Sequence, residues 1–387
     1  MGGMEEHPLQ DARGMPAEAR LNTTARLTER LELIYRWYAG MVNPETGMLE
    51  YLYLPQSDTF VRERSAIRDI ASVWIVAVLS EFLHRRDLDP LIETSLQHYG
   101  RFLVERDGYR FLDLQATPRH RPGARTRLDE PPSIAHSAFM LLALLHAPPP
   151  RNDRRLAWIT GLAQGILRQQ RPDGSYRVYF VDLPDAGEEL YAGEAMLALM
   201  ETFRQFPDPR YRQSVERAFS YYDAQYFRRG RVEDDLLVFF ANWQSQAGRL
   251  LFEATPSPAL RQEVAAFLFG LHDRIIARGF YDAVARFPAR QVSVEVACAL
   301  EGLNDAYALA RATSDRRATT YHQCVCTGLD YLLRAQRLDR CTDRERGGFG
   351  MSLDERAQRI DVTGHAASAF LKSVANGIEC PPNTGAA

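Results

Sequence analysis

One stretch of the chain, residues 188–203 (EELYAGEAMLALMETF), constrains the fold more than any other. It begins with polar residues and continues as Ala, Leu and Met with almost no polar side. A helix that is apolar on nearly every side is buried between other elements rather than laid on a surface. Because the polar residues lie in the first two turns, we expect that end to open on water or on a ligand.

The same plan recurs along the chain, with a short polar lead-in before an apolar helical run near residues 69, 133, 242, 293 and 363. Upstream of each run lies a glycine followed by aromatic or aliphatic residues: Gly47, Gly108, Gly174, Gly230, Gly279 and Gly347. About 50 to 70 residues separate successive glycines, which is room for two helices and two loops. The sequence therefore predicts six degenerate helical hairpins.

The other helix of each hairpin is amphipathic. Residues 23–41 carry Leu27, Leu31 and Ile34 on one side, which is typical of a helix with one wet face and one packed face. The remaining predicted outer helices are 91–106, 154–171, 209–227, 258–278 and 317–336. The predicted inner helices are 69–84, 133–146, 188–203, 240–253, 291–310 and 360–374.

Buried inner helices wrapped by amphipathic outer ones predict an all-α fold, an (α/α)6 toroid with short β-like turns. A straight α-solenoid is the alternative, but it would give its end repeats polar capping faces. Neither the first nor the last inner helix has such a face, so we favour a closed ring. We expect a single toroid domain over residues 21–376, a disordered leader over 1–20 and a loose C-terminal tail over 377–387.

The composition limits the classes of binding partner that we expect. The formal net charge of -3 gives no reason to expect nucleic acid or an anionic membrane as a partner. No apolar run approaches the roughly 20 residues of a membrane span, and the acidic residues 1–20 do not form a secretory signal. We therefore expect a cytoplasmic protein that binds a polar or sugar-like small molecule.

The five cysteines are odd in number and crowd the C-terminal quarter, which favours reduced thiols over a disulfide framework. His322, Cys324 and Cys326 lie two apart on a predicted helix and so point to different faces. No second pair has zinc-like spacing, and we predict neither a metal nor a cofactor. Lys372 is the single lysine among the 47 basic residues. A Schiff base would have to use it, far from the polar end of its helix.

In a toroid, the polar ends of the inner helices converge on one face around a central pit. Ten candidate side chains lie within about two turns of a helix start: Asp69, Trp74, His136, Glu189, Tyr191, Glu194, Trp243, Gln244, Glu295 and His365. Carboxylates and imidazoles in a pit are the usual groups for general acid/base catalysis. Aromatic side chains offer flat apolar faces to a sugar ring. In ring order, each of the two histidines neighbours a repeat that carries a glutamate.

Each residue also has a structural interpretation. The helix dipole stabilises a glutamate such as Glu189 near a helix N-terminus without any catalytic role, and Trp74 fits a core position. An unpaired Glu or His inside an apolar helix nevertheless costs free energy, and this happens in most repeats at the same depth. We predict Glu194 and His365 as the acid/base pair, followed by His136 and Glu295. The predicted substrate contacts are Trp243, Tyr191, Gln244, Glu189, Asp69 and, for an anionic group, Arg68 and Arg290.

Residues 118–132 (PRHRPGARTRLDEPP) are the most loop-like segment. Loops longer than about 12 residues inside compact domains are usually functional or disordered. The four arginines Arg119, Arg121, Arg125 and Arg127 could grip a carboxylate or phosphate, and a solvated flexible loop is the alternative.

Three segments carry a resemblance to a known superfamily: YAGEAMLAL (191–199), NWQ (242–244), and GGFG with RIDVTGH (347–350 and 359–365). They resemble bacterial six-hairpin proteins of the N-acylglucosamine 2-epimerase and six-hairpin glycosidase type, over about residues 25 to 375. The resemblance implies the toroid and a carbohydrate-like ligand in the pit. It leaves open whether the chain, which we expect to be an enzyme, is a glycoside hydrolase or a sugar epimerase.

A second resemblance is to squalene-cyclase-like toroids, in the turn QRPDGSY (170–176) and in residues 336–349. Their DxDD acid motif is missing, and Asp234 with Asp235 does not replace it. The alternatives are therefore a terpene-cyclase-like or natural-product tailoring enzyme on the same scaffold, and a non-catalytic binding toroid.

Overall fold

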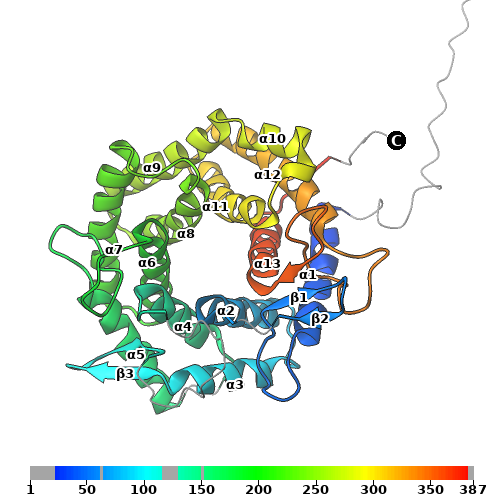
Figure 1. Cartoon of the computed structure of the whole chain (residues 1–387). Helices are drawn as coiled ribbons and strands as arrows, with labels where there is room; N and C mark the ends of the chain where they lie inside the picture. Colours follow the sequence, from blue (N-terminus) through cyan, green and yellow to red (C-terminus); the bar gives the residue numbers. More distant parts are fainter. Residues whose placement is uncertain (1–21, 62–63, 116–129, 150–151, 382–387) are drawn as a thin grey trace, which may run out of the picture.

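The computed structural model describes residues 22–61, 64–115, 130–149 and 152–381. Six apolar helices form an inner ring around a central lumen (Figure 1). They are α2 (Ala66–Phe82), α4 (Ile134–His146), α6 (Glu188–Gln205), α8 (Leu237–Ala254), α11 (Ser293–Ala312) and α13 (Ile360–Ala375). Each packs against the next, and α13 packs against α2. The ring is therefore closed, which confirms the predicted (α/α)6 toroid and excludes the open solenoid.

The outer layer consists of α1 (Thr23–Gly40), α3 (Asp89–Gly100), α5 (Asp153–Arg168), α7 (Pro209–Tyr222), α9 (Pro258–Ala277) and α12 (Arg317–Ala335). A π-helical turn (Asp223–Arg228) extends α7. A short helix α10 (Phe280–Arg286) and a 3-10 turn (Pro288–Arg290) connect α9 to α11.

Burial follows the pattern in the sequence. Every residue of α4 from Ile134 to Leu145 is buried, whereas α7 buries one stripe: Tyr211, Ser214, Val215, Ala218, Phe219 and Tyr222. A stripe spaced by three and four residues lies on one side of a helix. The difference between the two kinds of helix therefore sets the two layers.

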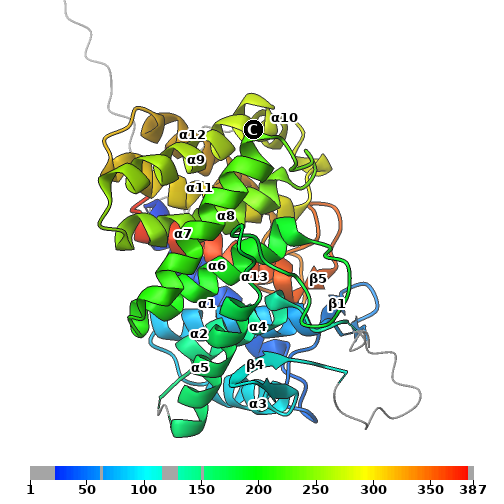
Figure 2. The same ribbon diagram turned by 90° about the vertical axis from the view of Figure 1, so that its left-hand side faces the viewer.

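Short strands cluster on the face of the ring where the inner helices begin (Figure 2). β1 (Leu52–Leu54) pairs antiparallel with β2 (Thr59–Phe60) and with β5 (Gln358–Arg359). Since β5 leads directly into α13, this sheet joins the first and last hairpins and helps to close the ring.

One outer helix is shorter than predicted. The expected helix 91–106 ends at Gly100, and residues 103–112 form a hairpin of β3 (Leu103–Arg106) and β4 (Tyr109–Leu112). The turn residues Asp107 and Gly108 have φ angles of 47° and 78°. An Asp-Gly pair favours this two-residue turn because both positions need a positive φ. The Asp-Gly pair in the sequence indicates a hairpin, but the helical pattern of the residues before this pair favoured a continuous helix.

The cysteine prediction is wrong for one pair. Cys326 on α12 and Cys380 form a disulfide with a Cα–Cα distance of 5.5 Å. Glu379, in the predicted loose tail, accepts hydrogen bonds from the Thr23 amide (2.9 Å) and the Thr24 hydroxyl (2.8 Å) at the start of α1. The spacing of the cysteines in the sequence could not show this disulfide, because the disulfide depends on the return of the C-terminal segment to α12 in the closed ring.

The predicted leader and residues 382–387 lie outside the described residues. Of the helices in the described ranges, none combines the length and apolarity needed to cross a bilayer.

Candidate active site

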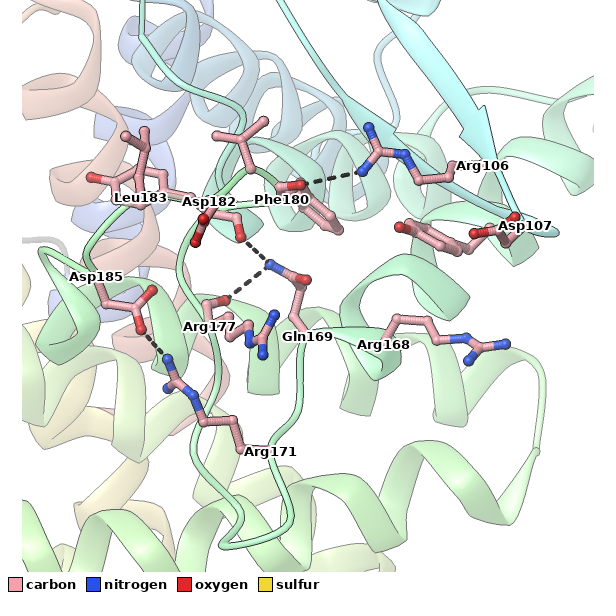
Figure 3. A pocket seen from close by; sticks show the side chains of 13 residues that line it. Arg106, Asp107, Arg168, Gln169, Arg171, Arg177, Phe180, Asp182, Leu183 and Asp185 are labelled. Carbon is pink, nitrogen blue, oxygen red and sulfur yellow. Dashed lines mark hydrogen bonds and ion pairs between the residues drawn. The ribbon is translucent and has the colours of Figure 1, made fainter.

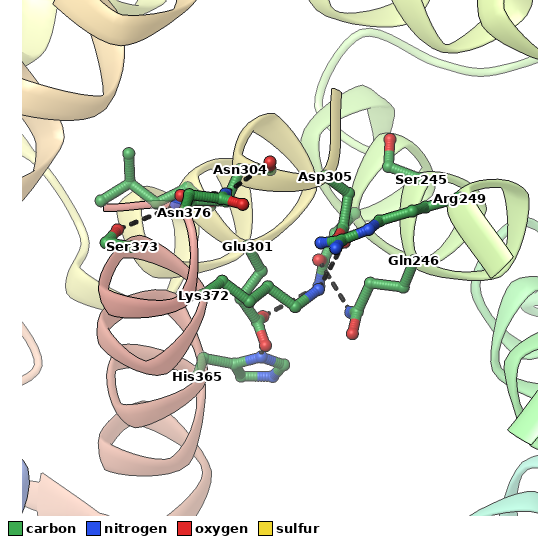
Figure 4. A network of polar contacts seen from close by, with 12 residues as sticks. Ser245, Gln246, Arg249, Glu301, Asn304, Asp305, His365, Lys372, Ser373 and Asn376 are labelled. Carbon is green, nitrogen blue, oxygen red and sulfur yellow. Dashed lines mark hydrogen bonds and ion pairs between the residues drawn. The ribbon is translucent and has the colours of Figure 1, made fainter. Parts of the chain in front are cut away.

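The polar centre of the lumen is a hydrogen-bonded pair on α11 and α13 (Figure 4). Glu301 Oε2 lies 2.6 Å from His365 Nδ1 and accepts a hydrogen bond from Asn242 Nδ2 at 3.0 Å. Gln246 Nε2, one turn further along α8, donates to Asn242 Oδ1 at 3.0 Å. Three neighbouring inner helices thus hold one carboxylate and one imidazole in a fixed orientation.

Aromatic rings line the lumen beside this pair. The rings of Trp74, Phe139, Trp243 and His365 follow one another at centroid distances of 6.1, 5.6 and 5.9 Å. They enclose a cavity of about 30 Å³ that Glu301 also lines. This is room for about one water molecule.

The neighbours of His365 shift the pKa of its side chain. Burial lowers the pKa of His365, but Cys298 and Glu301 outweigh burial and raise that pKa well above its ordinary value. Because Glu301 holds Nδ1, Nε2 is the ring nitrogen that this carboxylate leaves free to exchange a proton with a ligand.

Glu194 supplies a neutral carboxyl group across the lumen. It lies on α6, three steps around the six-membered ring from α13, and its side chain is buried. Burial raises the pKa of Glu194 to about 8, and the charge of His365 opposes this rise. At neutral pH this group therefore keeps its proton and can act as a general acid.

A second carboxylate, Asp361, is held by arginines at the start of α13. Arg68 Nε lies 3.0 Å from Asp361 Oδ2, and Arg359 Nε lies 2.5 Å from Oδ1. Burial would raise the pKa of Asp361, but Arg359 and Arg68 outweigh it and lower that pKa. The guanidinium of Arg68 is thus engaged by an acid of the chain, and its role as a substrate contact remains a prediction.

Several polar atoms in the inner helices have no partner among the described residues. They include Asp69 Oδ1, Trp74 Nε1, Glu194 Oε2 and both amide atoms of Gln244. Buried polar groups without partners are rare in folded proteins because each costs free energy. These atoms lie on α2, α6 and α8, and they are consistent with polar positions completed by water or a ligand.

Asp69 is directed elsewhere than predicted. Its Oδ2 accepts a hydrogen bond of 2.6 Å from Tyr99 on the outer helix α3. Burial raises the pKa of Asp69 to about 6, and the bond from Tyr99 lowers it. This aspartate therefore ties the two layers together, and it does not line the cavity at His365.

His136 lies close to polar groups near the start of its own helix. Its Nδ1 lies 2.7 Å from the hydroxyl of Ser133, the N-cap residue of α4, and its Nε2 lies 3.1 Å from Glu130 Oε2. The structure thus places this histidine beside the N-cap of α4, and its catalytic role remains a prediction.

Other predicted residues do not line the cavity at His365. Arg290 lies on an exposed turn with its guanidinium 5.3 Å from the Phe287 ring centroid. Glu295 is partly exposed on the first turn of α11, and Glu189 is partly exposed on the first turn of α6. Tyr191 is partly buried; burial, followed by the charge of Glu194, raises its pKa to about 12. Their roles remain predictions.

Sequence reasoning missed Glu301 and Asn242 as site residues. Glu301 lies six residues after Glu295, about 9 Å along the helix axis, inside the apolar run VACALEGL. A carboxylate in the middle of a buried helix needs a partner, and that signal pointed more strongly to Glu301 than to Glu295.

Cys298 adds a thiol to the Glu301–His365 pair. One ligand atom from each of these three residues lies within 4.8 Å of the others. Cys, His and Glu are the residue types that bind zinc, so these side chains could hold a transition metal. Burial raises the pKa of the Cys298 thiol, and His365 opposes the rise.

A separate cleft of about 650 Å³ lies between the β3–β4 hairpin and residues 168–185 (Figure 3). Arg171 pairs there with Asp185, and Gln169 Nε2 donates to the Tyr179 carbonyl at 2.6 Å. Arg106 donates to the Phe180 carbonyl at 3.5 Å. Most of the arginine-rich loop 118–132, including its four arginines, lies outside the described residues.

Known structures share this fold. A D-mannose isomerase superposes with a TM-score of 0.64 at 13% identity, covering 94% of this chain and 99% of its own. The cellobiose 2-epimerase of Spirochaeta thermophila DSM 6192 gives 0.64 at 14% identity, covering 94% and 100%. The GH76 alpha-mannanase BT2949 of Bacteroides thetaiotaomicron gives 0.59 at 10%, covering 93% and 97%.

The sequence itself matches no family model and no curated protein. The structural likeness confirms the predicted resemblance to the six-hairpin toroids of sugar epimerases and glycosidases. At these identities it establishes the fold, and the reaction has to be argued from the side chains of this chain.

Proposed function

We propose that the protein is a carbohydrate-active enzyme of the sugar epimerase or isomerase type. It moves a proton at the carbon next to the carbonyl of an open-chain reducing sugar. The observation that carries this proposal is the His365–Glu301 pair, joined at 2.6 Å and placed across the lumen from the neutral carboxyl group of Glu194.

The two groups have complementary roles. His365 accepts the proton from the sugar carbon at Nε2 in its neutral form, whose share grows as the pH rises because its pKa is raised. The Glu301 carboxylate stabilises the imidazolium that forms. The electron pair of the broken C–H bond moves into the carbonyl and gives an enediolate. Glu194, on the opposite wall, returns a proton to the other face of the same carbon to give the epimer. Return to the neighbouring carbon gives the isomer.

Glycoside hydrolysis is the second candidate, because a neutral buried carboxyl such as Glu194 is also the acid that glycosidases use. Hydrolysis needs a second carboxylate that is free to activate water or attack the sugar. Glu301 Oε2 is bonded by His365 and Asn242, and both oxygens of Asp361 are bonded by arginines. This distribution of partners favours proton transfer over hydrolysis.

The proposal is tested by incubating the protein with a panel of reducing mono- and disaccharides in D2O. We expect deuterium to appear by NMR at the carbon next to the carbonyl, together with an epimer or ketose. His365→Ala and Glu194→Gln should each lower the rate at least 100-fold, the typical effect of losing a general acid or base. His322→Ala, on the outer helix α12, is the matched control and should keep full activity.

Cleavage of aryl glycosides without any deuterium exchange would instead establish the hydrolase. Full exchange activity in folded His365→Ala and Glu194→Gln proteins would refute the assigned residues.

A further inference from the structure

The lumen has a second hollow on the other side of Trp74. A chamber of about 490 Å³ is lined by residues from the last turns of five inner helices: Phe82, His146, Arg204, Glu253 and Ala375. It therefore opens at the C-terminal ends of the inner helices, opposite the polar face. Its volume falls within the range of roughly 300 to 1,000 Å³ that small-molecule sites occupy.

The deep end of the chamber is polar and buried. Trp74, Gln246, Ser368 and Asp305 line it and are 8%, 6%, 6% and 3% exposed. In the described part of the chain, the Ser368 hydroxyl and Gln246 Oε1 have no protein hydrogen-bond partner. Both side chains are largely buried and line the chamber, so these two groups can bond to a ligand that enters it.

The charges around the chamber are already paired. Asp305 lies 2.5 Å from the amine of Lys372 and 3.1 Å from Arg249, which also binds Glu253 at 3.0 Å. Figure 4 shows Lys372 and Arg249 converging on Asp305 from α13 and α8. A charged ligand would have to break such a pair at a cost of desolvation, so the chamber suits an uncharged molecule.

The two sides of the chamber differ in polarity. Ile75, Val78 and Leu197 from α2 and α6 form an apolar wall opposite Gln246, Asp305 and Ser368 from α8, α11 and α13. In their last turns, α2 and α6 also contribute the polar residues Glu81, Glu201 and Arg204. The helix C-termini around the opening favour hydrogen-bond donors, because their free carbonyl groups carry partial negative charge. A ring polyol presents an apolar C–H face and several O–H donors, and it matches both sides.

We propose that this chamber is a second small-molecule site, separate from the one at His365, and that it binds a neutral polyol of monosaccharide size. The site is also connected to the catalytic pair. Gln246 contacts the chamber, donates to Asn242, and through Asn242 reaches Glu301, the partner of His365. A ligand that engages Gln246 thus acts on the residue that holds Asn242 in place.

The probe is myo-inositol, which is neutral and has no carbonyl group, so it cannot undergo the proposed reaction. Titration calorimetry of the wild type should show one inositol per chain, and a crystal soak should place it against Ser368. D-Glucuronate, which is charged, should bind at least tenfold more weakly. His365→Ala should bind inositol as the wild type does, whether or not the proposed function is correct.

Two variants fill the chamber from α13: Ser368→Phe and, in case that protein does not fold, Leu371→Trp. Either should weaken inositol binding at least tenfold, whereas Ser220→Phe, on the exposed side of α7, should not. The proposal is overturned if the wild type does not bind inositol at tens of millimolar, if folded chamber variants bind it unchanged, or if glucuronate binds more tightly.

Discussion

Glu194→Gln tests the electrostatics of the lumen most directly, because it removes a titrating proton while keeping the shape of the side chain. The pKa of Glu194 rises on folding from 4.5 to about 8, mainly because the side chain is buried. Between these two pH values the folded chain keeps a proton that the unfolded chain releases. The contribution of Glu194 to the stability of the wild type therefore falls as the pH rises through this window and is level on either side of it.

The size of the effect follows from the same values. At 1.36 kcal/mol for each pH unit, the change from 4.5 to about 8 corresponds to an upper limit on the order of 5 kcal/mol. Gln does not titrate, so the free energy of unfolding of the variant lacks this fall with rising pH. Relative to the wild type, the free energy of unfolding of Glu194→Gln should rise by a few kcal/mol between pH 5 and pH 9.

Urea unfolding of both proteins at several pH values measures this difference. Glu189→Gln removes a carboxylate from the first turn of the same helix, at a partly exposed position, and is the matched control. If the wild-type and Glu194→Gln curves remain parallel from pH 5 to pH 9, Glu194 is not a buried neutral acid, and its proposed role as proton donor is refuted with it.

Three further predictions concern other parts of the structure. Glu301→Gln removes a carboxylate that raises the pKa of His365, so the acidic limb of the rate profile should move to lower pH, as measured by kcat/KM. Cys326→Ser should lower the free energy of unfolding by about 2 to 4 kcal/mol, and a reductant should remove most of the difference from the wild type. In Gly193→Ala the new methyl group would lie 2.5 Å from Trp243 Cβ. The two helices must then separate, which we expect to cost about 1 to 3 kcal/mol and to change the tryptophan fluorescence; an unchanged stability and spectrum would contradict the close packing.

The layers of the fold were readable from the sequence because burial leaves a local pattern. A helix such as α4, apolar on every side, can only lie inside, and a helix with one stripe, such as α7, can only lie at the periphery. The repetition of this pair predicted the ring, and the polar helix starts are the reason for proposing the site on that face. Glu194, Trp243 and His365 followed from the same argument, since polar and aromatic side chains interrupt apolar runs there.

Tertiary structure alone decided which side chains meet. The rotation of each inner helix about its axis placed Glu301 rather than Glu295 beside His365 and turned Asp69 outward to Tyr99. The return of the C-terminal segment to the outer helix α12 joined Cys326 to Cys380. These contacts join residues that are distant in the chain, and they depend on angles and depths that no local pattern encodes. The chamber beyond Trp74 likewise exists only because six helices close into a ring. The sequence by itself thus determined the two layers of helices, and the closure of the ring determined which side chains contact one another.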